Sequence, residues 1–546
     1  MKLSVLVGVF LLFALQLTAT NYYSDPVNGS MSNSGAGTSP WGSLSDIFTA
    51  NKKFEVGDTI FLRTGNHGYA VIKGVNTGFV VIMPEAGHSP IISRVRISST
   101  ANSPAKFWKL SGLTIQSQAT GNNATPSYYL LEVYPYATDI TISGCTITSD
   151  LNTAGWTRDD WRNRCNSGIF TRPRLNANIL IENNLILNTA FGLAVGSSHT
   201  IVRNNTVQYF TNDGSRVLGS HIIFEHNRIM DLMKVMTKDE NHDDLFQSFT
   251  NANGAGQDTL RDNIIRANLF LCASDTSRPF RGAVQGIGCF DGPFLNWTIE
   301  NNIVICDHWH GISMYGAIDC KIINNTVIDP YVYTPYDPSD NNPTSVGPAW
   351  IRIDKKNGGP GSINNTVNNN LVAASVIIVS ATMGAASNNI VIGAVGNYSS
   401  FFVNADDVAN PSNFDLHLKG SASAVDAGIS DFAPLEDYDG NIRPKGASFD
   451  VGAFEYDPTT SLVQNLNYDL AFACFPNPST SHLTIESKCN QKIDRLQLCT
   501  LQGRLVLSKN INDFNAELNL SGLSDSVYFL KIYCGNVSSS RLIIVH

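Results

Sequence analysis

The chain has 546 residues, of which 43% are hydrophobic and 15% charged, and its formal net charge is −9. That length can bury a large core and exceeds one ordinary globular domain. The sequence contains no basic tract, which argues against nucleic acid as a partner. A polyanionic substrate would have to be attracted by local lysines and arginines.

The N-terminus has the order of a secretory signal. Lys2 precedes a mostly apolar run from Leu3 to Leu17, and small residues follow it. The run is short for a membrane span and suits a cleaved signal peptide, which we place at residues 1–20. We find no other apolar stretch of membrane length, so the sequence predicts an exported protein with no transmembrane segment.

The ten cysteines do not form a recognisable pairing pattern. Export permits disulfides, but Cys289, Cys306 and Cys320 lie in strand-like runs, where a free cysteine packs as a small apolar residue. Spacing alone leaves the pairing open.

A short helix is predicted near the start of the mature chain. In "SPWGSLSDIFTANKKF", Ser43 is a candidate N-cap ahead of a roughly helical apolar pattern. We expect this segment to cover the N-terminal end of the fold that follows, where strand edges would otherwise be unpaired.

An asparagine-containing phrase recurs through the middle of the chain, as in "LIENNLIL", "IVRNNTVQ" and "TIENNIVI". Each phrase is a short β-branched strand, a polar corner and a second short strand. Asparagine tolerates left-handed backbone dihedrals, and stacked amides can form a hydrogen-bonded ladder. The last asparagines of the phrases are Asn184, Asn205, Asn227, Asn268, Asn302, Asn325, Asn370 and Asn389.

The shorter gaps between these asparagines give a period near 20 residues, and the longer ones fit two periods or one period with an insertion. Such a period indicates an all-β protein built as a right-handed parallel β-helix, a solenoid whose coils share one core. The lines "FWKLSGLTIQS" and "ITISGCTITS" fit as earlier coils. We assign residues 21–457 to this domain.

Both ends of the solenoid resemble known modules. The opening "YYSDPVNGSMSNSGAGTSPWGSL" is similar to the start of secreted right-handed β-helix proteins of the polysaccharide-lyase (alginate lyase-like) type. Residues 414–456, which include "DYDGNIRPKGASFDVGAFEY", resemble the closing segment of bacterial surface β-helix proteins.

The C-terminal residues 469–546, after a polar linker at 458–468, resemble the type A sorting domain of the Bacteroidetes type IX secretion system. The resemblance lies in Pro476-Asn477-Pro478, Gln502-Gly503-Arg504 and the "VYFLKI" strand. Alternating strands predict a small β-sandwich here. The resemblance implies the type IX machinery as a partner and a secreted or cell-surface location. Carbohydrate binding through Tyr528 and Tyr533 is the alternative.

Unusual polar residues concentrate between residues 239 and 356. They fall in "NHDDLFQSF", "RPFRGAVQGIGCFDG", "DHWHGISMYGA" and "PAWIRIDKKNGG". On stacked coils, parallel positions lie about 4.8 Å apart, so these segments can line one groove. The whole run resembles bacterial β-helix proteins of the alginate-lyase and polyuronate-modifying kind.

The acidic segment supplies His242, Asp243 and Gln247 as candidates. Neighbouring strand residues point to opposite faces, so Asp243 and Asp244 are not expected to form a catalytic pair. One can orient a histidine or bind a cation while the other completes a turn. An Asx-type turn before a strand is the alternative for the whole motif.

The segment "DHWHGISMY" is the strongest candidate. Ile312 and Met314 share one strand face, which leaves Tyr315 on the other face as a proton donor or a sugar-stacking surface. His308 and His310 flank Trp309, whose ring suits a pyranose face. Structural histidines hydrogen-bonded to corner carbonyls are the alternative.

Several cations near one groove suit a substrate that carries carboxylates, because arginine binds carboxylate through two parallel hydrogen bonds. Surface ion pairs to Asp291 or Asp354 are the alternative for each of them. The further candidates for substrate contact in these segments are Arg278, Arg281, Gln285, Asp291, Arg352 and Lys355.

The sequence and its resemblance together predict a lyase that cleaves an alginate- or pectate-like polyuronate by β-elimination. Arg281, Gln285 or a cation would neutralise the uronate, His242 or His310 would act as the base, and Tyr315 as the acid. A polygalacturonase-like hydrolase completed by Asp291 or Asp307, a C5-epimerase and a non-catalytic glycan binder remain alternatives.

Ca²⁺ is the one cofactor that the sequence suggests. The runs "DYDGN" and "NADD" offer oxygen ligands of the kind that Ca²⁺ prefers. We expect a monomer.

Overall fold

A computed structural model describes most of the chain. The described residues are 19–98, 100–117, 128–235, 243–250, 259–274, 279–330, 348–356, 361–378, 385–393, 395–407, 410–457, 472–475, 479, 481–487, 492–500, 505–523, 526–534 and 537–545. The chain divides into two compact units. One comprises the residues up to Phe414 and Ser421–Tyr456, and the other comprises Asp415–Gly420 and the residues from Asp457 on.

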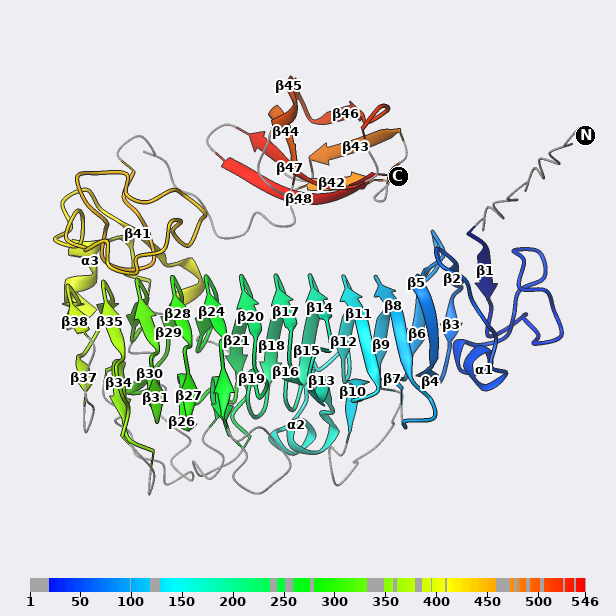
Figure 1. The fold of residues 1–546 in the computed structure, drawn as a ribbon, viewed down its shortest axis with the longest axis horizontal. Helices are drawn as coiled ribbons and strands as arrows, with labels where there is room; N and C mark the ends of the chain where they lie inside the picture. Colours follow the sequence, from blue (N-terminus) through cyan, green and yellow to red (C-terminus); the bar gives the residue numbers. More distant parts are fainter. Residues whose placement is uncertain are drawn as a thin grey trace, which may run out of the picture. The chain divides into compact units, whose positions relative to one another are not determined.

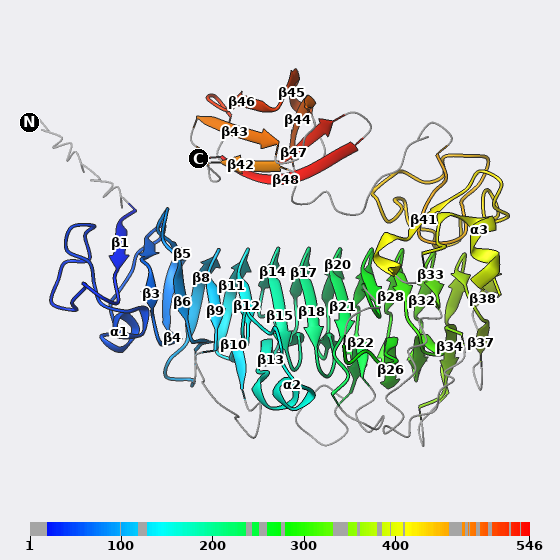
Figure 2. The ribbon, with the colours of Figure 1, turned by 180° about the vertical axis from the view of Figure 1, so that it is seen from behind.

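The first unit is a right-handed parallel β-helix, as predicted, and Figures 1 and 2 show its strands stacked in rows. Among the described residues, three long sheets run along it. Sheet 1 consists of β1 (Asn21–Ser24), β2 (Thr59–Leu62), β5 (Gly74–Pro84), β8 (Ala105–Ser111), β11 (Ala137–Ser143), β14 (Ile179–Glu182), β17 (Thr200–Arg203), β20 (Ile222–Glu225), β24 (Ile264–Arg266), β28 (Thr298–Glu300), β32 (Lys321–Ile323), β35 (Thr366–Asn368) and β38 (Ala385–Ser387).

Sheets 2 and 3 complete each coil. Sheet 2 consists of β3 (Gly65–Asn66), β6 (Pro90–Ile92), β9 (Thr114–Gln116), β12 (Thr146–Thr148), β15 (Leu185–Thr189), β18 (Thr206–Phe210), β21 (Arg228–Leu232), β25 (Leu269–Leu271), β29 (Ile303–Ile305), β33 (Thr326–Ile328), β36 (Leu371–Val372) and β39 (Ile390–Val391). Sheet 3 consists of β4 (Tyr69–Ile72), β7 (Arg94–Ile97), β10 (Tyr129–Val133), β13 (Ser167–Arg174), β16 (Leu193–Ser197), β19 (Ser215–Val217), β22 (Asp244–Phe249), β26 (Gln285–Asp291), β30 (His310–Tyr315), β34 (Trp350–Asp354) and β37 (Val376–Ile378).

A fourth, short parallel sheet follows the turns after sheet 3. It contains β23 (Leu260–Arg261), β27 (Phe294–Leu295) and β31 (Ala317–Ile318). A helix, α2 (Arg158–Arg164), precedes β13 and lies beside the strands of sheet 3 in Figures 1 and 2. Thr157 caps its N-terminus, since its hydroxyl accepts from the backbone nitrogen of Asp160.

The predicted asparagine ladder is confirmed at the corner between sheets 1 and 2. We call the stack from Asn184 to Asn389 the asparagine corner. Nδ2 of Asn184 donates to Oδ1 of Asn205 at 2.8 Å, and the same bond repeats, at 2.8–3.1 Å, through to Asn389. Each of these carboxamide oxygens also accepts from the backbone nitrogen of the preceding rung. The amides therefore satisfy one another along the whole corner.

The left-handed backbone at each corner belongs to the residue before the ladder asparagine. Asn183 has φ of 56°, Asn301 of 53° and Asn369 of 56°. In the earlier coils glycine takes the turn, with φ of 65° at Gly112 and 64° at Gly144. The two asparagines of each pair thus have different roles: the first adopts the left-handed turn conformation and the second forms the hydrogen bonds of the ladder.

The predicted helix is present as α1 (Leu44–Thr49), capped by Ser43, whose hydroxyl accepts from the backbone nitrogen of Asp46. Leu44, Ile47 and Phe48 are buried. The Phe48 ring lies 5.3 Å from that of Trp108 on β8, so the helix covers apolar side chains at the N-terminal end of the solenoid, as expected.

The closing segment, residues 414–456, is fastened to the outside of the asparagine corner. The first asparagine of four paired corners donates to a carbonyl oxygen of this segment. The bonds run from Asn301 to Glu436 at 2.6 Å, Asn324 to Asp450 at 2.8 Å, Asn369 to Ile429 at 2.8 Å and Asn388 to Ala427 at 2.7 Å. A buried ion pair between Arg443 and Glu455, at 2.7 Å, holds the segment internally.

Short elements precede the closing segment in the chain: η2 (Val395–Asn397), α3 (Tyr398–Phe401), β40 (Phe402–Asn404) and η3 (Pro411–Asn413). The closing segment itself begins with β41 (Asp415–Leu418). The hydroxyl of Tyr398 donates to the backbone oxygen of Asp329 at 2.8 Å.

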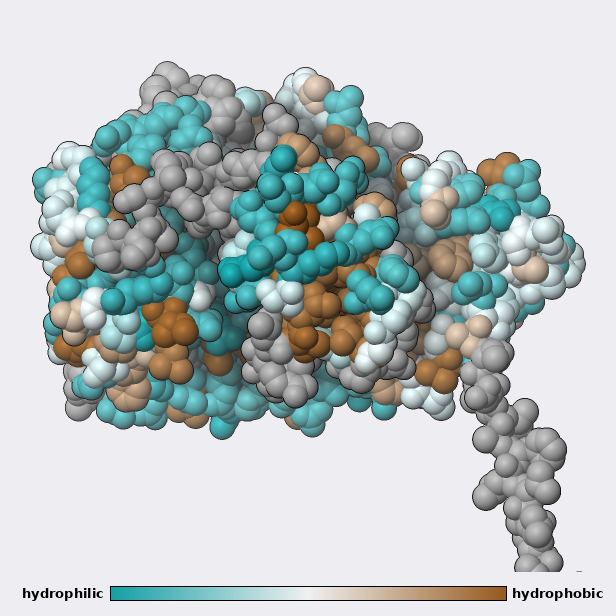
Figure 3. Space-filling model, turned by 90° about the horizontal axis from the view of Figure 1, so that it is seen from above, coloured by the Kyte–Doolittle hydropathy of each residue, from teal (hydrophilic) through white to brown (hydrophobic). Residues whose placement is uncertain are grey.

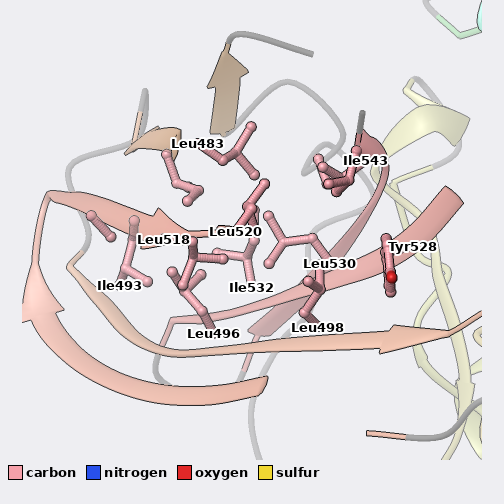
Figure 4. Close-up of a cluster of buried hydrophobic side chains, with 13 residues drawn as sticks. Leu483, Ile493, Leu496, Leu498, Leu518, Leu520, Tyr528, Leu530, Ile532 and Ile543 are labelled. Atoms are coloured by element: carbon pink, nitrogen blue, oxygen red, sulfur yellow. The ribbon is translucent and has the colours of Figure 1, made fainter. Parts of the chain in front are cut away.

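The second unit is the predicted small β-sandwich. One antiparallel sheet contains β42 (Phe472–Phe475), β43 (His482–Ser487) and β46 (Asn515–Asn519), and the other contains β45 (Leu505–Asp513), β44 (Ile493–Thr500), β47 (Ser526–Cys534) and β48 (Val537–Val545). Figure 4 shows the apolar cluster formed between them. Leu483, Leu496 and Leu530 in this cluster are fully buried. Alternation of buried and outward residues supplies this core, as the sequence predicted.

The cysteines that the structure describes with their side chains are free thiols, and Cys289, Cys306 and Cys320 are buried, as expected. In the view of Figure 3, hydrophilic residues cover most of the coloured surface and hydrophobic ones form separate groups. Among the described residues, no helix has the length and apolarity needed to cross a bilayer. The predicted signal peptide lies almost wholly, and the linker wholly, outside the described residues.

Candidate active site

The side chains that point outward from sheet 3 form a continuous row. The register of the parallel strands aligns, in order, Arg96, Glu132, Phe170, Ala194, Arg216, Gln247, Gly288, Ser313 and Arg352. Four residues of this row have a polar residue three positions earlier in the chain. Asp244, Gln285 and His310 begin β22, β26 and β30, and Asp213 lies two residues before β19. We call this surface the outer face of sheet 3.

An aromatic cluster occupies the outer face at β26, β30 and β34. The Phe290 ring lies 5.0 Å from His310 and 5.2 Å from Tyr315, and His310 lies 5.4 Å from Trp350. Trp309 stacks on Trp350 with the ring centroids 6.1 Å apart. All five side chains are partly exposed, so their faces are open to a ligand such as a pyranose ring.

The imidazole of His310 is held by three neighbours. Its Nδ1 lies 2.8 Å from Oγ of Ser313, which also accepts from Nε1 of Trp350 at 3.4 Å. The His308 ring stacks at 5.2 Å, and Nδ1 of His308 accepts from the His310 backbone nitrogen at 3.1 Å. These contacts fix the plane of the His310 ring within the aromatic cluster.

Arg352 and Tyr315 are neighbours on β34 and β30. The guanidinium lies 6.0 Å from the Tyr315 ring centroid and 5.4 Å from that of Trp350. Nη2 of Arg352 donates to Asp354 at 2.6 Å, and this hydrogen bond raises the pKa of the guanidinium. Burial raises the pKa of Tyr315, while the charge of Arg352 opposes the shift. At neutral pH the phenol is therefore a proton donor.

Two buried carboxyl groups lie one coil apart, that of Asp213 just before β19 and that of Asp244 at the start of β22. The backbone nitrogen of Asp244 donates to Oδ1 of Asp213 at 3.0 Å, and Nε of Arg216 pairs with Asp213 at 2.5 Å. Nε2 of Gln247 donates to Asp244 at 2.9 Å. Burial raises the pKa of Asp213 to about 6. Burial and then the charge of Asp213 raise the pKa of Asp244 well above its usual value.

Two buried polar atoms at this place have no hydrogen-bond partner, one in Asp244 itself and one in Gln285. They are Oδ1 of Asp244 and Oε1 of Gln285. The two residues are register partners on β22 and β26. Gly288 follows in the same strand, where an added Cβ would collide with Oδ1 of Asp244. With glycine there, the carboxyl group of Asp244 lies against bare backbone, and an added side chain would displace it.

The turn before β22 contains a second charged group. Nζ of Lys234 pairs with Asp243 at 2.6 Å, and both side chains are about 98% buried. Nearby, Asp307 accepts from the backbone nitrogen of Val284 at 3.1 Å. Burial raises the pKa of Asp307 to about 7, and the charges of Arg281 and Lys234 oppose the shift.

The predicted site residues divide into three groups. His308, Trp309, His310, Tyr315 and Arg352 gather in and around the aromatic cluster, with Gln247 and Gln285 on the adjacent strands of the same face. Asp243 and Arg281 lie in the turns, while Asp291 and Lys355 are exposed at or just beyond strand ends. His242 and Arg278 lie outside the described residues. The roles assigned to all of them stay predictions.

Sequence reasoning missed Asp213 and Arg216. A second repeat could have found them, since "SGIF", "FGLA", "DGSR", "QGIG" and "HGIS" each place a glycine at the start of a sheet-3 strand. At Gly286 and Gly311 an added Cβ would meet core valines and backbone oxygens of the next coil. Aligning these glycines puts Asp213 level with His310.

No set of three or more metal-ligating side chains occurs among the residues that the structure describes. In "DYDGN", Asp437 accepts from the backbone nitrogens of Asp439 and Asn441. In "NADD", Asp407 accepts from the amides of Asn410 and Asn413. Both carboxylates serve local turns, and calcium binding stays a prediction.

Comparison with known proteins identifies the C-terminal unit. Residues 473–546 match the family model of the secretion system C-terminal sorting domain. The chain carries a sorting domain. The protein is therefore directed by a secretion machinery to the cell surface or the extracellular space. A comparison with curated proteins found no match for the sequence.

Several solved structures are similar to the chain in fold. Pectate lyase Pel9A is 16% identical and has a TM-score of 0.44, with 81% of this chain and 97% of that chain covered. The GH136 lacto-N-biosidase from Eubacterium ramulus is 11% identical with a TM-score of 0.37, covering 68% and 67%. DFA-IIIase from Arthrobacter chlorophenolicus A6, in complex with GF2, is 12% identical with a TM-score of 0.31, covering 68% and 92%.

Proposed function

We propose that the protein is a secreted polysaccharide lyase that cleaves a uronic-acid polymer, alginate- or pectate-like, by β-elimination on the outer face of sheet 3. The observation that carries the proposal is the meeting of three groups on two adjacent strands. The His310 ring lies 6.4 Å from that of Tyr315, and the Arg352 guanidinium lies 6.0 Å from the Tyr315 ring.

Each group supplies one requirement of the elimination. Arg352 binds and neutralises the uronate carboxylate, which makes the C5 proton more acidic. His310 takes that proton, and its contact with Ser313 fixes the ring for the task. The C4–C5 double bond forms as the C4–O4 bond breaks. Tyr315 gives its proton to O4 of the leaving sugar and is reprotonated from solvent.

The remaining predicted residues take binding roles in this proposal. Trp309 and Trp350 offer stacked indole rings to a sugar face, and Gln247 and Gln285 offer amides along the neighbouring coils. The carboxylate of Asp243 pairs with Lys234. In this proposal the carboxyl group that contacts the substrate on the outer face of sheet 3 is therefore that of Asp244 and not that of Asp243.

The test uses purified full-length protein with alginate, pectate and glycosaminoglycans, read by the ultraviolet absorbance of new C4–C5 double bonds. Tyr315→Phe removes only the phenolic proton and is expected to lower kcat by about 10²- to 10⁴-fold. Tyr22→Phe makes the same change on β1 and should leave kcat at the wild-type value. Absence of unsaturated product on every polyuronate would refute the lyase.

One observation favours a second candidate, a glycoside hydrolase. Asp213 and Asp244 are buried, close and of raised pKa, as a general acid requires. A hydrolase would release reducing ends without absorbance, and Asp244→Asn would abolish them. A C5-epimerase would give neither signal but would change the product NMR spectrum, and a non-catalytic binder would leave the polymer unaltered.

A further inference from the structure

The N-terminal strands of sheet 3 carry a cluster of arginines around one glutamate. Glu132, on β10, is 2% exposed. It accepts from Nε of Arg172 at 2.8 Å, and lies 3.5 Å from Nη2 of both Arg94 and Arg96. We call these four residues the arginine cluster. Three positive charges surround one negative charge, so the arginine cluster keeps a net positive charge that can attract an anionic ligand.

Aromatic rings hold the guanidinium groups in place. Arg94 lies 4.4 Å from the Tyr128 ring, while Arg96 and Arg172 lie 4.7 and 4.8 Å from that of Tyr134. The arginine side chains remain 20%, 26% and 41% exposed for Arg94, Arg96 and Arg172. Stacked, fixed guanidinium groups with open edges suit carboxylate recognition, because little rotamer entropy is lost on binding. Nε of Arg96 is buried and has no hydrogen-bond partner.

The arginine cluster belongs to the same outer face as the aromatic cluster. Arg96 and Glu132 are in the row that ends at Arg352, eight strand steps away, or about 38 Å at the usual strand spacing. Along the way the row contains the small residues Ala194 and Gly288 and the larger residues Phe170, Arg216 and Gln247. Burial raises the pKa of Tyr129 on β10, and the charge of Arg216 opposes the shift.

We infer that the arginine cluster is a distal subsite that binds the carboxylates of a long polyuronate whose scissile bond lies at the aromatic cluster. The inference rests on the proposed function, and it adds the length and charge of the substrate. An extended chain of uronates places a carboxylate at intervals along the row. Short oligomers reach only the aromatic cluster, whereas long ones reach the arginines as well.

Calorimetric titration of full-length Tyr315→Phe protein with oligouronates of graded length tests this inference without turnover. Affinity is expected to rise with length until the arginine cluster is reached. The Arg94→Gln/Arg96→Gln pair should weaken binding of the long oligomers by about tenfold or more, and should reduce its salt dependence. Arg172 remains to pair with Glu132 in this variant.

A matched control removes the same charge from another face. Arg203 and Arg266 pair with Glu182 and Glu225 on the outer side of sheet 1, so Arg203→Gln/Arg266→Gln should leave oligouronate affinity at its starting value. Equal weakening by both pairs, or long oligomers insensitive to Arg94 and Arg96, would overturn the inference. Length-dependent binding that needs these arginines, in a protein that forms no unsaturated product, would overturn the proposed lyase and leave the subsite standing.

Discussion

The asparagine corner and the outer face of sheet 3 arise from the same stacking of coils, but they use it differently. At the corner, one residue type repeats and each amide is satisfied by the next rung. On the outer face, nearly every coil contributes a different side chain, and Asp244 and Gln285 keep buried oxygens without partners. Uniform stacking stabilises the solenoid, whereas varied stacking brings unlike chemical groups together.

The difference has an energetic meaning. A buried polar group without a partner costs about 1–3 kcal/mol, so a protein retains one only where the rest of the structure supports it. The ladder and the apolar core provide that support. Unsatisfied and charge-rich positions are also where ligands gain most from binding, and the reaction that we propose at His310, Tyr315 and Arg352 lies on the same face.

Breaking the corner is expected to give the largest effect. Asn268→Ala removes the acceptor for the Asn227 amide and backbone, and the donor to the Phe224 carbonyl. With several buried groups left unpaired, the free energy of unfolding should fall by about 4 kcal/mol, as measured by urea denaturation. Asn389→Ala, at the partly exposed last rung, should cost about 1 kcal/mol. Equal losses at both rungs would contradict the cooperative ladder.

On the outer face, Asp213 is expected to stabilise the fold more at low pH than at high pH, which is the opposite of an ordinary carboxylate. Asp213 has a folded-state pKa of about 6 against an ordinary 3.8, so the native state binds this proton more tightly. Its contribution to stability is complete below pH 3.8 and is lost as the pH rises through about 6, by about 3 kcal/mol.

Comparing Asp213→Asn with wild type at pH 4 and pH 7 isolates this contribution. The variant should lose less stability than wild type across that interval in urea unfolding. Asp159→Asn, at an exposed position on α2, should follow the wild type. A variant whose loss between the two pH values matches that of wild type would show that burial does not protonate Asp213.

Next to the aromatic cluster, Arg352→Lys tests whether substrate binding needs the planar shape of the guanidinium group or only its positive charge. Lysine keeps the positive charge but not the planar fork that Asp354 now orients. We expect kcat/KM on polyuronate to fall by about 10- to 50-fold, with unfolding nearly unchanged. Arg495→Lys alters a similar arginine–tyrosine contact in the sorting domain and should leave the kinetics as in wild type. Full activity in Arg352→Lys would show that the mechanism does not need the planar guanidinium group.

The smallest effect is expected at the outer residue of a paired corner. Asn388→Ala loses one exposed hydrogen bond to the Ala427 carbonyl, so the free energy of unfolding should fall by about 0.5–1 kcal/mol. Thermal unfolding measures it. A loss as large as that of Asn268→Ala would mean that the closing segment, not the ladder, dominates the corner.

The fold could be predicted because the corner repeats. All eight ladder asparagines could be located from the sequence, since a stacked amide selects the same residue in every coil. The candidate site was predicted only where its residues fell inside distinctive phrases, as His310 and Tyr315 do. The arginine cluster lies in coils without the asparagine phrase, and its row changes residue type at each step.

Alternation also has a limit that Asp243 and Asp244 illustrate. The period of two predicts opposite directions for neighbours but not which neighbour faces outward, because that depends on the residue at which the strand begins. The strand begins at Asp244, which leaves Asp243 in the turn beside Lys234.

The fastening of the closing segment sets an order on assembly. Asn301 binds the Glu436 carbonyl, a partner 135 residues later in the chain, and three later corners bind the same segment. Coils from β28 onward therefore lack part of their final hydrogen bonding until residues 427–450 have arrived. A chain interrupted before that point would keep a well-formed N-terminal solenoid with a loosened far end, and proteolysis would trim it from that end.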